Sequence, residues 1–129
     1  MNDQLFKNMI MNNWNAVVYA NMNNIVEYVN PAACKLYGYK EQELLGQTTD
    51  IFNSNLSHNT DEIVQSIKKQ GYWSGEIIQK RKDNSTFDAL LSVQLMFNDD
   101  GETVGFASNS KDITDELATN KKLKKNIEE

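Results

Sequence analysis

The sequence is poor in the residues that usually form crosslinks or metal sites. It contains one cysteine and one histidine among 129 residues, so no intrachain disulfide can form and no His/Cys group has metal-ligand spacing. One proline and six glycines are typical of an ordered globular chain. We therefore expect a single domain whose core suffices for stability without a disulfide or a metal.

Long apolar runs and an excess of basic residues are also missing. No segment approaches the roughly eighteen apolar residues of a membrane-spanning helix, and the N-terminus lacks the basic start of a secretory signal. Thirteen basic and 18 acidic side chains give a formal charge of −5, which disfavours binding to nucleic-acid phosphates. We expect a cytoplasmic protein without direct membrane or nucleic-acid contact.

What the sequence does contain is β-forming runs separated by turn signals. The clusters Lys-Asp-Asn-Ser at 82–85 and Asn-Asp-Asp-Gly at 98–101 are typical of antiparallel hairpins. The predicted strands cover residues 16–20, 25–29, 73–80, 86–97 and 103–112. In the longest of them, alternation predicts a core face formed by Phe87, Ala89, Leu91, Val93, Leu95 and Phe97.

Helical signals occupy the stretch between the second and third strands. Asn30 and Pro31 are a good N-cap and first residue for a short helix that ends near Gly38. A second short helix is expected at 40–45, and residues 47–57 are predicted to be irregular.

A longer helix is expected from Asn59 or Thr60 to Gln70, with Gly71 at its end. Its apolar face is predicted to contain Ile63, Val64 and Ile67. Together the elements predict an α+β fold in which helices cover one side of a five-stranded antiparallel sheet.

Both ends of the chain show helical patterns. Residues 3–12 place apolar side chains at helical spacing, and the tail carries a stripe of Ile113, Leu117, Asn120, Leu123 and Ile127. Because the last residues stop within this pattern without a capping signal, we expect the chain to be part of a longer protein.

Several segments, in this order, resemble the PAS family of sensory domains. They are NPAACKLYGY, EQELLGQ, WSGEIIQKRKDNSTF, NDDGETVGF and KDIT. The resemblance implies the PAS fold, a sheet of strand order 2-1-5-4-3 with helices over one face, and N- and C-terminal flanking helices. It divides the chain into a flanking helix at 1–14, the PAS domain at 15–114 and the start of a signalling helix at 115–129.

In function, the resemblance implies a sensory or dimerisation module rather than an enzyme. Such domains supply input to histidine kinases of two-component systems and to related signalling proteins, so the expected partners are a second copy of the chain and an output domain downstream. Two alternatives stay open. One is a redox sensor that binds FAD or FMN, and the other is a structural dimerisation module without a ligand.

A ligand cavity is expected between the sheet and the helices. Alternation places Phe106, Ser108 and Ser110 on one face of the last strand, and Leu91 and Val93 on the strand before it. Because serines in an apolar pocket need hydrogen-bond partners, a flavin or a small polar ligand is a candidate occupant, as is buried water.

Three further cavity residues are predicted from the helix and from the resemblance. Ile63 and Ile67 face the sheet in the longer helix, while Trp73, with Glu76, resembles positions beside the cofactor of flavin-binding relatives. His58 precedes the corresponding position of haem ligands in relatives, so haem is disfavoured. Cys34 does not match the cysteine of photoactive relatives, which excludes blue-light adduct chemistry.

Signal output is predicted at the end of the last strand. Asp112 is expected to tie this strand to the following helix by a hydrogen bond or an ion pair, with Ile113 and Thr114 completing the transmission segment. The helix from Asp115 onwards resembles the start of a parallel coiled coil in relatives. The alternative is a surface helix folded back on its own sheet.

Overall fold

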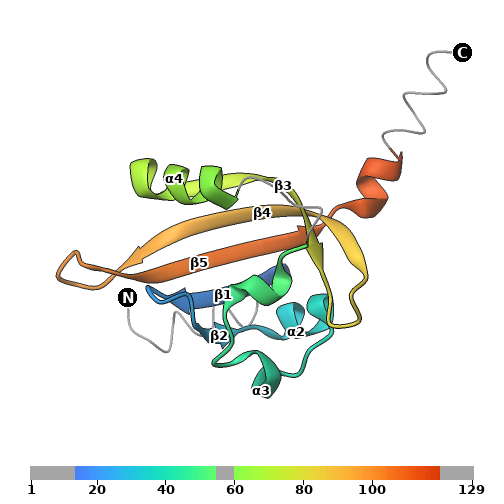
Figure 1. Ribbon diagram of the computed structural model, residues 1–129, viewed down its shortest axis with the longest axis horizontal. Helices are drawn as coiled ribbons and strands as arrows, with labels where there is room; N and C mark the ends of the chain where they lie inside the picture. Colours follow the sequence, from blue (N-terminus) through green and yellow to red (C-terminus); the bar gives the residue numbers. More distant parts are fainter. Residues whose placement is uncertain (1–13, 55–59, 120–129) are drawn as a thin grey trace, which may run out of the picture.

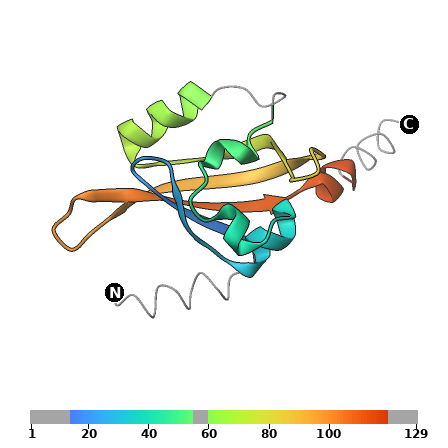
Figure 2. The same ribbon diagram turned by 60° about the horizontal axis from the view of Figure 1, so that its bottom comes forward.

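The computed structural model describes residues 14–54 and 60–119 of the chain. Its five strands form one antiparallel sheet in the order β2-β1-β5-β4-β3, which confirms the α+β fold and the predicted strand order. Figures 1 and 2 show the strands side by side in one twisted sheet. The strands are β1 (Ala16–Asn21), β2 (Val26–Val29), β3 (Tyr72–Lys80), β4 (Thr86–Phe97) and β5 (Thr103–Asp112).

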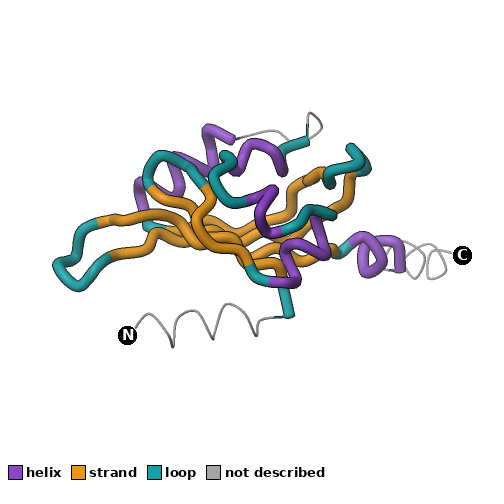
Figure 3. Tube along the Cα trace, turned by 90° about the horizontal axis from the view of Figure 1, so that it is seen from below, coloured by secondary structure: helices purple, strands orange, loops and turns teal. Residues whose placement is uncertain are grey.

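The helices lie between β2 and β3 in sequence and on one side of the sheet in space, as Figure 3 shows. The opposite face of the sheet carries none of them. Residues 114–119 are also helical and leave the sheet at the end of β5, away from the protruding β4–β5 hairpin. The helices are α2 (Pro31–Tyr37), α3 (Glu41–Leu44), the 3₁₀ helix η1 (Thr49–Phe52) and α4 (Thr60–Gln70).

The first helix begins and ends as its sequence predicts. The Asn30 side chain accepts a hydrogen bond from the Ala33 N–H, and Pro31 occupies the first turn. Gly38 ends the helix with a φ of 79°, a left-handed conformation that glycine adopts without a Cβ penalty. Local capping chemistry therefore sets the length of α2.

The core lies between the sheet and the helices α2, α3 and η1. Its buried side chains come from both layers, and it includes Tyr37, Leu44 and Phe52 beneath the helices and Phe87 and Ala89 on β4. None of the described helices is long and apolar enough to cross a membrane.

Some expectations differ from the structure. Phe97 was predicted to face the core but is 57% exposed, because a register shift between Met96 and Phe97 ends the regular alternation of β4. Val64 is 40% exposed, whereas Ile67 of the same helix is buried. The stretch 47–57, expected to be irregular, contains η1, whose Phe52 is held in the core.

The predicted helix at 3–12, the histidine at 58 and the tail stripe beyond 119 lie outside the described residues.

Candidate functional site

The predicted cavity residues of the sheet share its helix-facing side. In the strand register, Trp73 pairs with Val93, Val93 pairs with Ser108, and Leu91 pairs with Ser110. Directly paired residues of antiparallel strands point to the same face. Sequence alternation on two separate strands therefore predicted one common surface.

Glu76 does not belong to this surface. It pairs with Leu90, which pairs with Lys111, and all three side chains are exposed. They lie on the face without helices, because residues an odd number of positions apart in a strand point to opposite sides. The expectation that Glu76 lies beside the cavity together with Trp73 was wrong.

The helix-facing surface is filled at one end and accessible at the other. Leu91 and Ser110 are only 7% and 1% exposed, whereas Trp73, Val93 and Ser108 are half-buried. Of the remaining predicted residues, Phe106 and Ile63 are half-buried and Ile67 is buried.

A groove of about 520 Å³ lies where α4 leads into β3, and its lining includes Tyr72, Ser74, Ser92 and Gln94, which point to the face without helices. It takes in Trp73 and Val93 but none of the other predicted cavity residues. The Trp73 indole lies over Gly75, since a Cβ added there would come within 2.7 Å of Trp73 Cζ2. The groove is lined by Gln70, Gly71, Tyr72, Trp73, Ser74, Ser92, Val93, Gln94, Leu95 and Phe97.

The filled end contains a buried polar cluster that the sequence did not predict. The Tyr37 hydroxyl lies 2.9 Å from Gln79 Oε1 on β3 and 2.9 Å from Ser110 Oγ on β5. Burial raises the pKa of Tyr37 to about 12, against a smaller opposing effect of these hydrogen bonds, so the hydroxyl stays protonated at neutral pH. Phe52 stacks on the Tyr37 ring at a centroid distance of 4.0 Å.

One signal could have pointed to part of this cluster. Gln79 is a polar residue at a helix-facing position, because it pairs with Phe87 of the core face. A buried glutamine needs a hydrogen-bond partner, but the sequence does not show that Tyr37 supplies it.

The cavity serines have partners within the protein. Ser110 meets the Tyr37 hydroxyl, and Ser108 Oγ donates to the carbonyl oxygen of Val18 at 3.3 Å. Among the described residues, every buried side-chain nitrogen or oxygen has a hydrogen-bond partner. The serines therefore do not require a flavin or another polar ligand to satisfy them.

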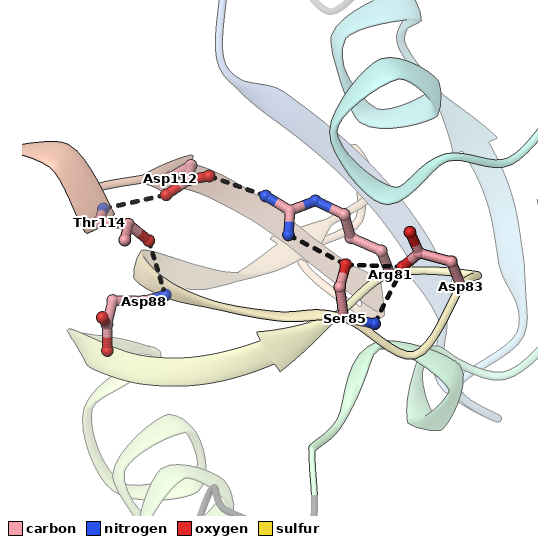
Figure 4. A network of polar contacts seen from close by, with 6 residues as sticks. All are labelled: Arg81, Asp83, Ser85, Asp88, Asp112 and Thr114. Carbon is pink, nitrogen blue, oxygen red and sulfur yellow. Dashed lines mark hydrogen bonds and ion pairs between the residues drawn. The ribbon is translucent and has the colours of Figure 1, made fainter.

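Asp112 lies at the centre of a second polar network, at the end of β5. Its Oδ2 pairs with Arg81 Nη2 at 2.9 Å, and its Oδ1 accepts a hydrogen bond from the Thr114 N–H at 2.9 Å. Figure 4 shows Arg81 reaching Asp112 from the turn between β3 and β4, where its other nitrogen donates to Ser85 Oγ. The hydrogen bond to Thr114 ties β5 to the following helix as predicted, whereas the ion pair ties Asp112 to the turn between β3 and β4.

Residues 113–114 are also attached to β4. The Ile113 N–H donates to the Asp88 carbonyl at 2.9 Å, and the Asp88 N–H donates to Thr114 Oγ1 at 3.2 Å. Ile113 is 8% exposed, so an apolar contact accompanies these hydrogen bonds. The start of the helix at 114–119 is therefore held by β4 and by the Asp112 side chain.

The family described as "PAS domain" matches residues 15–115. The chain belongs to the PAS domain family. The match covers both polar networks and all the predicted cavity residues, and the sheet order agrees with it.

Solved structures with the same fold support this assignment. The crystal structure of the PAS domain of a protein from Colwellia psychrerythraea superposes with a TM-score of 0.76 at 21% identity, covering 87% of this chain and 97% of that one. An RNA-binding light-oxygen-voltage receptor gives a TM-score of 0.81 at 18% identity over 97% of this chain and 37% of that one. At these identities the likeness concerns the fold.

The curated relatives that this chain matches include a regulatory protein and a potassium channel, both much longer than the chain. A nitrogen fixation regulatory protein of Klebsiella oxytoca is 24% identical over 106 residues, which are 81% of this chain and 21% of that protein. A human voltage-gated inwardly rectifying potassium channel, KCNH6, is 29% identical over 107 residues, 79% of this chain and 11% of the channel. The chain spans about a fifth or less of these relatives.

Cys34, the residue with possible redox chemistry, lies on α2 and not on the strands that form the helix-facing surface. Cys34 is half-buried on α2, and burial, followed by the nearby Glu41 carboxylate, raises the pKa of its thiol, which keeps it protonated. Within residues 14–54 and 60–119, no group of three His, Cys, Asp or Glu side chains could hold a metal.

Proposed function

We propose that this PAS domain is the sensory module of a larger cytoplasmic signalling protein, with a histidine kinase as the expected output. A small molecule binds on the helix-facing side of the sheet, and the resulting change passes through Asp112 to the helix after Ile113. The domain itself is proposed to be non-catalytic. It pairs with a second copy through its flanking helices.

The observation that carries this proposal is the uneven filling of the helix-facing surface. Side chains at the output end are buried, whereas Trp73, Val93 and Ser108 stay half-buried although they face the helix layer. A ligand placed beneath α4 would cover this apolar surface and gain from its removal from water. The shared sensory role of the family supports the same assignment.

Flavin binding is the alternative with the least structural support. The argument for it from unpaired cavity serines is lost, because Ser108 and Ser110 have protein partners. A colourless purified protein that takes up neither FMN nor FAD would remove this alternative.

Ligand binding can be tested by the fluorescence of Trp73. The chain has two tryptophans, and Trp14 is 96% exposed, so a Trp14→Phe variant makes Trp73 the sole reporter. We expect a compound that binds the half-buried surface to change the Trp73 emission. It should also stabilise the fold by about 2.7 kcal/mol at a hundred times its Kd, measured as a rise in Tm. FMN, FAD and a set of small aromatic and polar metabolites are the probes.

A matched pair of variants locates the site. Val93→Gln places a polar group on the helix-facing surface, whereas Leu90→Gln makes the same kind of change on the exposed face of the same strand. The first should weaken binding at least about tenfold and the second should not, since only the first alters the covered apolar area. Equal effects, or no response of Trp73 to any probe, would favour a structural module without a ligand.

Self-association through the tail gives a separate prediction. A chain ending at Thr114 should dimerise at least about tenfold more weakly than the full chain in sedimentation equilibrium, because the apolar stripe of the tail is lost. Leu117→Asp should weaken dimerisation to a similar extent. Thr119→Asp, at an exposed position of the same helix, should leave the dimer constant unchanged. An unchanged dimer constant for the shortened chain would refute this part.

A further inference from the structure

Tyr37 connects the helix layer with two strands that are not neighbours. It is the last residue of α2 and is 1% exposed. Its hydroxyl reaches Gln79 on β3 and Ser110 on β5, while its carbonyl oxygen accepts a hydrogen bond from the Lys82 N–H at 2.9 Å. Since β4 separates β3 from β5, Tyr37 joins them across the intervening strand.

The Arg81–Asp112 ion pair crosses β4 between the same two strand ends. Arg81 lies two positions after Gln79, and Asp112 lies two positions after Ser110. Residues two apart in a strand share a face, which places Asp112 on the face of Ser110, and the Arg81 guanidinium carbon lies 4.4 Å from the ring centroid of Phe87 on that same face. The Tyr37 link and the ion pair are therefore successive ties across β4, the first buried and neutral, the second half-exposed and ionic.

The Tyr37 hydroxyl is difficult to replace in this position. It carries one proton, which it donates to Gln79 Oε1, an amide oxygen that can only accept, and it accepts the proton of the Ser110 hydroxyl. If the hydroxyl is removed, the side chains of Gln79 and Ser110 lose a hydrogen-bond partner in a site where they are only 4% and 1% exposed. The ring is held between Phe52 of η1 and Phe87 of β4, with centroid distances of 4.0 and 6.0 Å.

We propose that the Tyr37 hydroxyl transmits movements of α2 and η1 to β5, and through β5 to the contacts that hold the helix at 114–119. Displacing the helix layer draws the hydroxyl away from Ser110 and frees the end of β5. Asp112 then loses its position opposite both Arg81 and the Thr114 N–H. This inference deepens the proposed function and rests on it, with Tyr37 as a positioning residue rather than a ligand-binding one.

Amide hydrogen exchange of the full chain, without a ligand, tests the link. The reporters are the Ile113 and Leu117 N–H groups, whose acceptors are the carbonyls of Asp88 and Ile113. Tyr37→Phe should accelerate their exchange by about five- to tenfold, the effect of one lost hydrogen bond in a buried site. The Val26 N–H of β2, the edge strand opposite β3, donates to the Gln47 carbonyl. Its exchange rate should change less than about twofold.

Two further variants separate the hydroxyl from the ring. Ser110→Ala removes the partner on β5 and should reproduce the Tyr37→Phe pattern. Tyr39→Phe is the control, because the Tyr39 ring also contacts Phe52 but its hydroxyl lies outside the polar cluster. It should leave all three reporters unchanged. If the exchange of the Ile113 and Leu117 amides is unchanged in the Ser110→Ala variant, the movement is not transmitted through Ser110.

A double-mutant cycle with Asp112→Ala, which removes both the ion pair to Arg81 and the acceptor for the Thr114 N–H, decides whether the two ties act in series. If they do, Asp112→Ala already releases the helix, and adding Tyr37→Phe should accelerate the exchange of the Ile113 and Leu117 amides less than about twofold further. If the two substitutions multiply each other's effects on the exchange rates, or if the Val26 amide is accelerated as much as Ile113 and Leu117, Tyr37 only stabilises the fold as a whole. Either result would overturn the proposal. Such a result would leave ligand binding, judged from Trp73 fluorescence, unaffected.

Discussion

Replacing Asn30 by alanine is expected to lower the free energy of unfolding by about 3 kcal/mol. Its Oδ1 accepts hydrogen bonds from the Val17 and Ala33 N–H groups, both at 2.9 Å, and its Nδ2 donates to the Asn15 carbonyl at 2.8 Å. The side chain is fully buried, so alanine would leave the N–H groups of β1 and of the start of α2 without these partners in the interior.

Asn98→Ala is the matched control for this prediction. Asn98 also accepts two backbone hydrogen bonds through its Oδ1, from Asp100 and Glu102, but it does so in an exposed turn. Water can replace those bonds, so the loss should stay below about 1 kcal/mol. Urea unfolding with equal m-values for both variants would measure the difference, and similar losses would show that burial of Asn30 is not the cause.

Phe87→Ala is the second substitution with a large expected effect, about 3 to 5 kcal/mol of lost stability. Phe87 is 4% exposed and lies beside both polar networks. Its ring is 6.0 Å from the Tyr37 ring, centroid to centroid, and the Arg81 guanidinium carbon lies 4.4 Å from its centroid. The substitution removes buried apolar area and leaves a cavity under both cross-strand ties.

The control lies on the same strand. Phe97→Ala removes an identical side chain that is 57% exposed, so its cost should stay below about 1 kcal/mol. Thermal and urea unfolding of the two variants would compare them directly. If Phe87→Ala also costs less than about 1 kcal/mol, neighbouring side chains have moved into the space left by the ring. The core beside the end of β5 would then not be closely packed.

The order of elements was predictable because each carries a local signal. The turn residues 98–101 separate β4 from β5, and both strands end where the sequence predicted. Asn30, Pro31 and Gly38 set α2 through capping and a left-handed φ. Such effects depend on neighbours in sequence, so they can be recognised without a structure.

The candidate site was predictable only in part. Alternation placed Val93 and Ser108 on one surface, because side chains in a strand point alternately to its two faces. It could not distinguish the half-buried end of that surface from the filled end, since this depends on where α2, η1 and α4 lie. The expectation that the cavity serines need a ligand as hydrogen-bond partner depended on the same information. The partner of Ser110 is Tyr37, which lies 73 positions earlier in the sequence, on a helix.

By itself, the sequence determined the strands, the capped helix α2, the family and the absence of an intrachain disulfide, since these follow from residue types and from spacings close together along the chain. Only the tertiary structure decided which polar groups meet. The Tyr37 hydroxyl joins residues separated by 42 and 73 positions, and Arg81 reaches Asp112 over 31. These contacts arise because packing the helix layer on a twisted sheet brings distant side chains into one buried volume, where each polar group must find a partner.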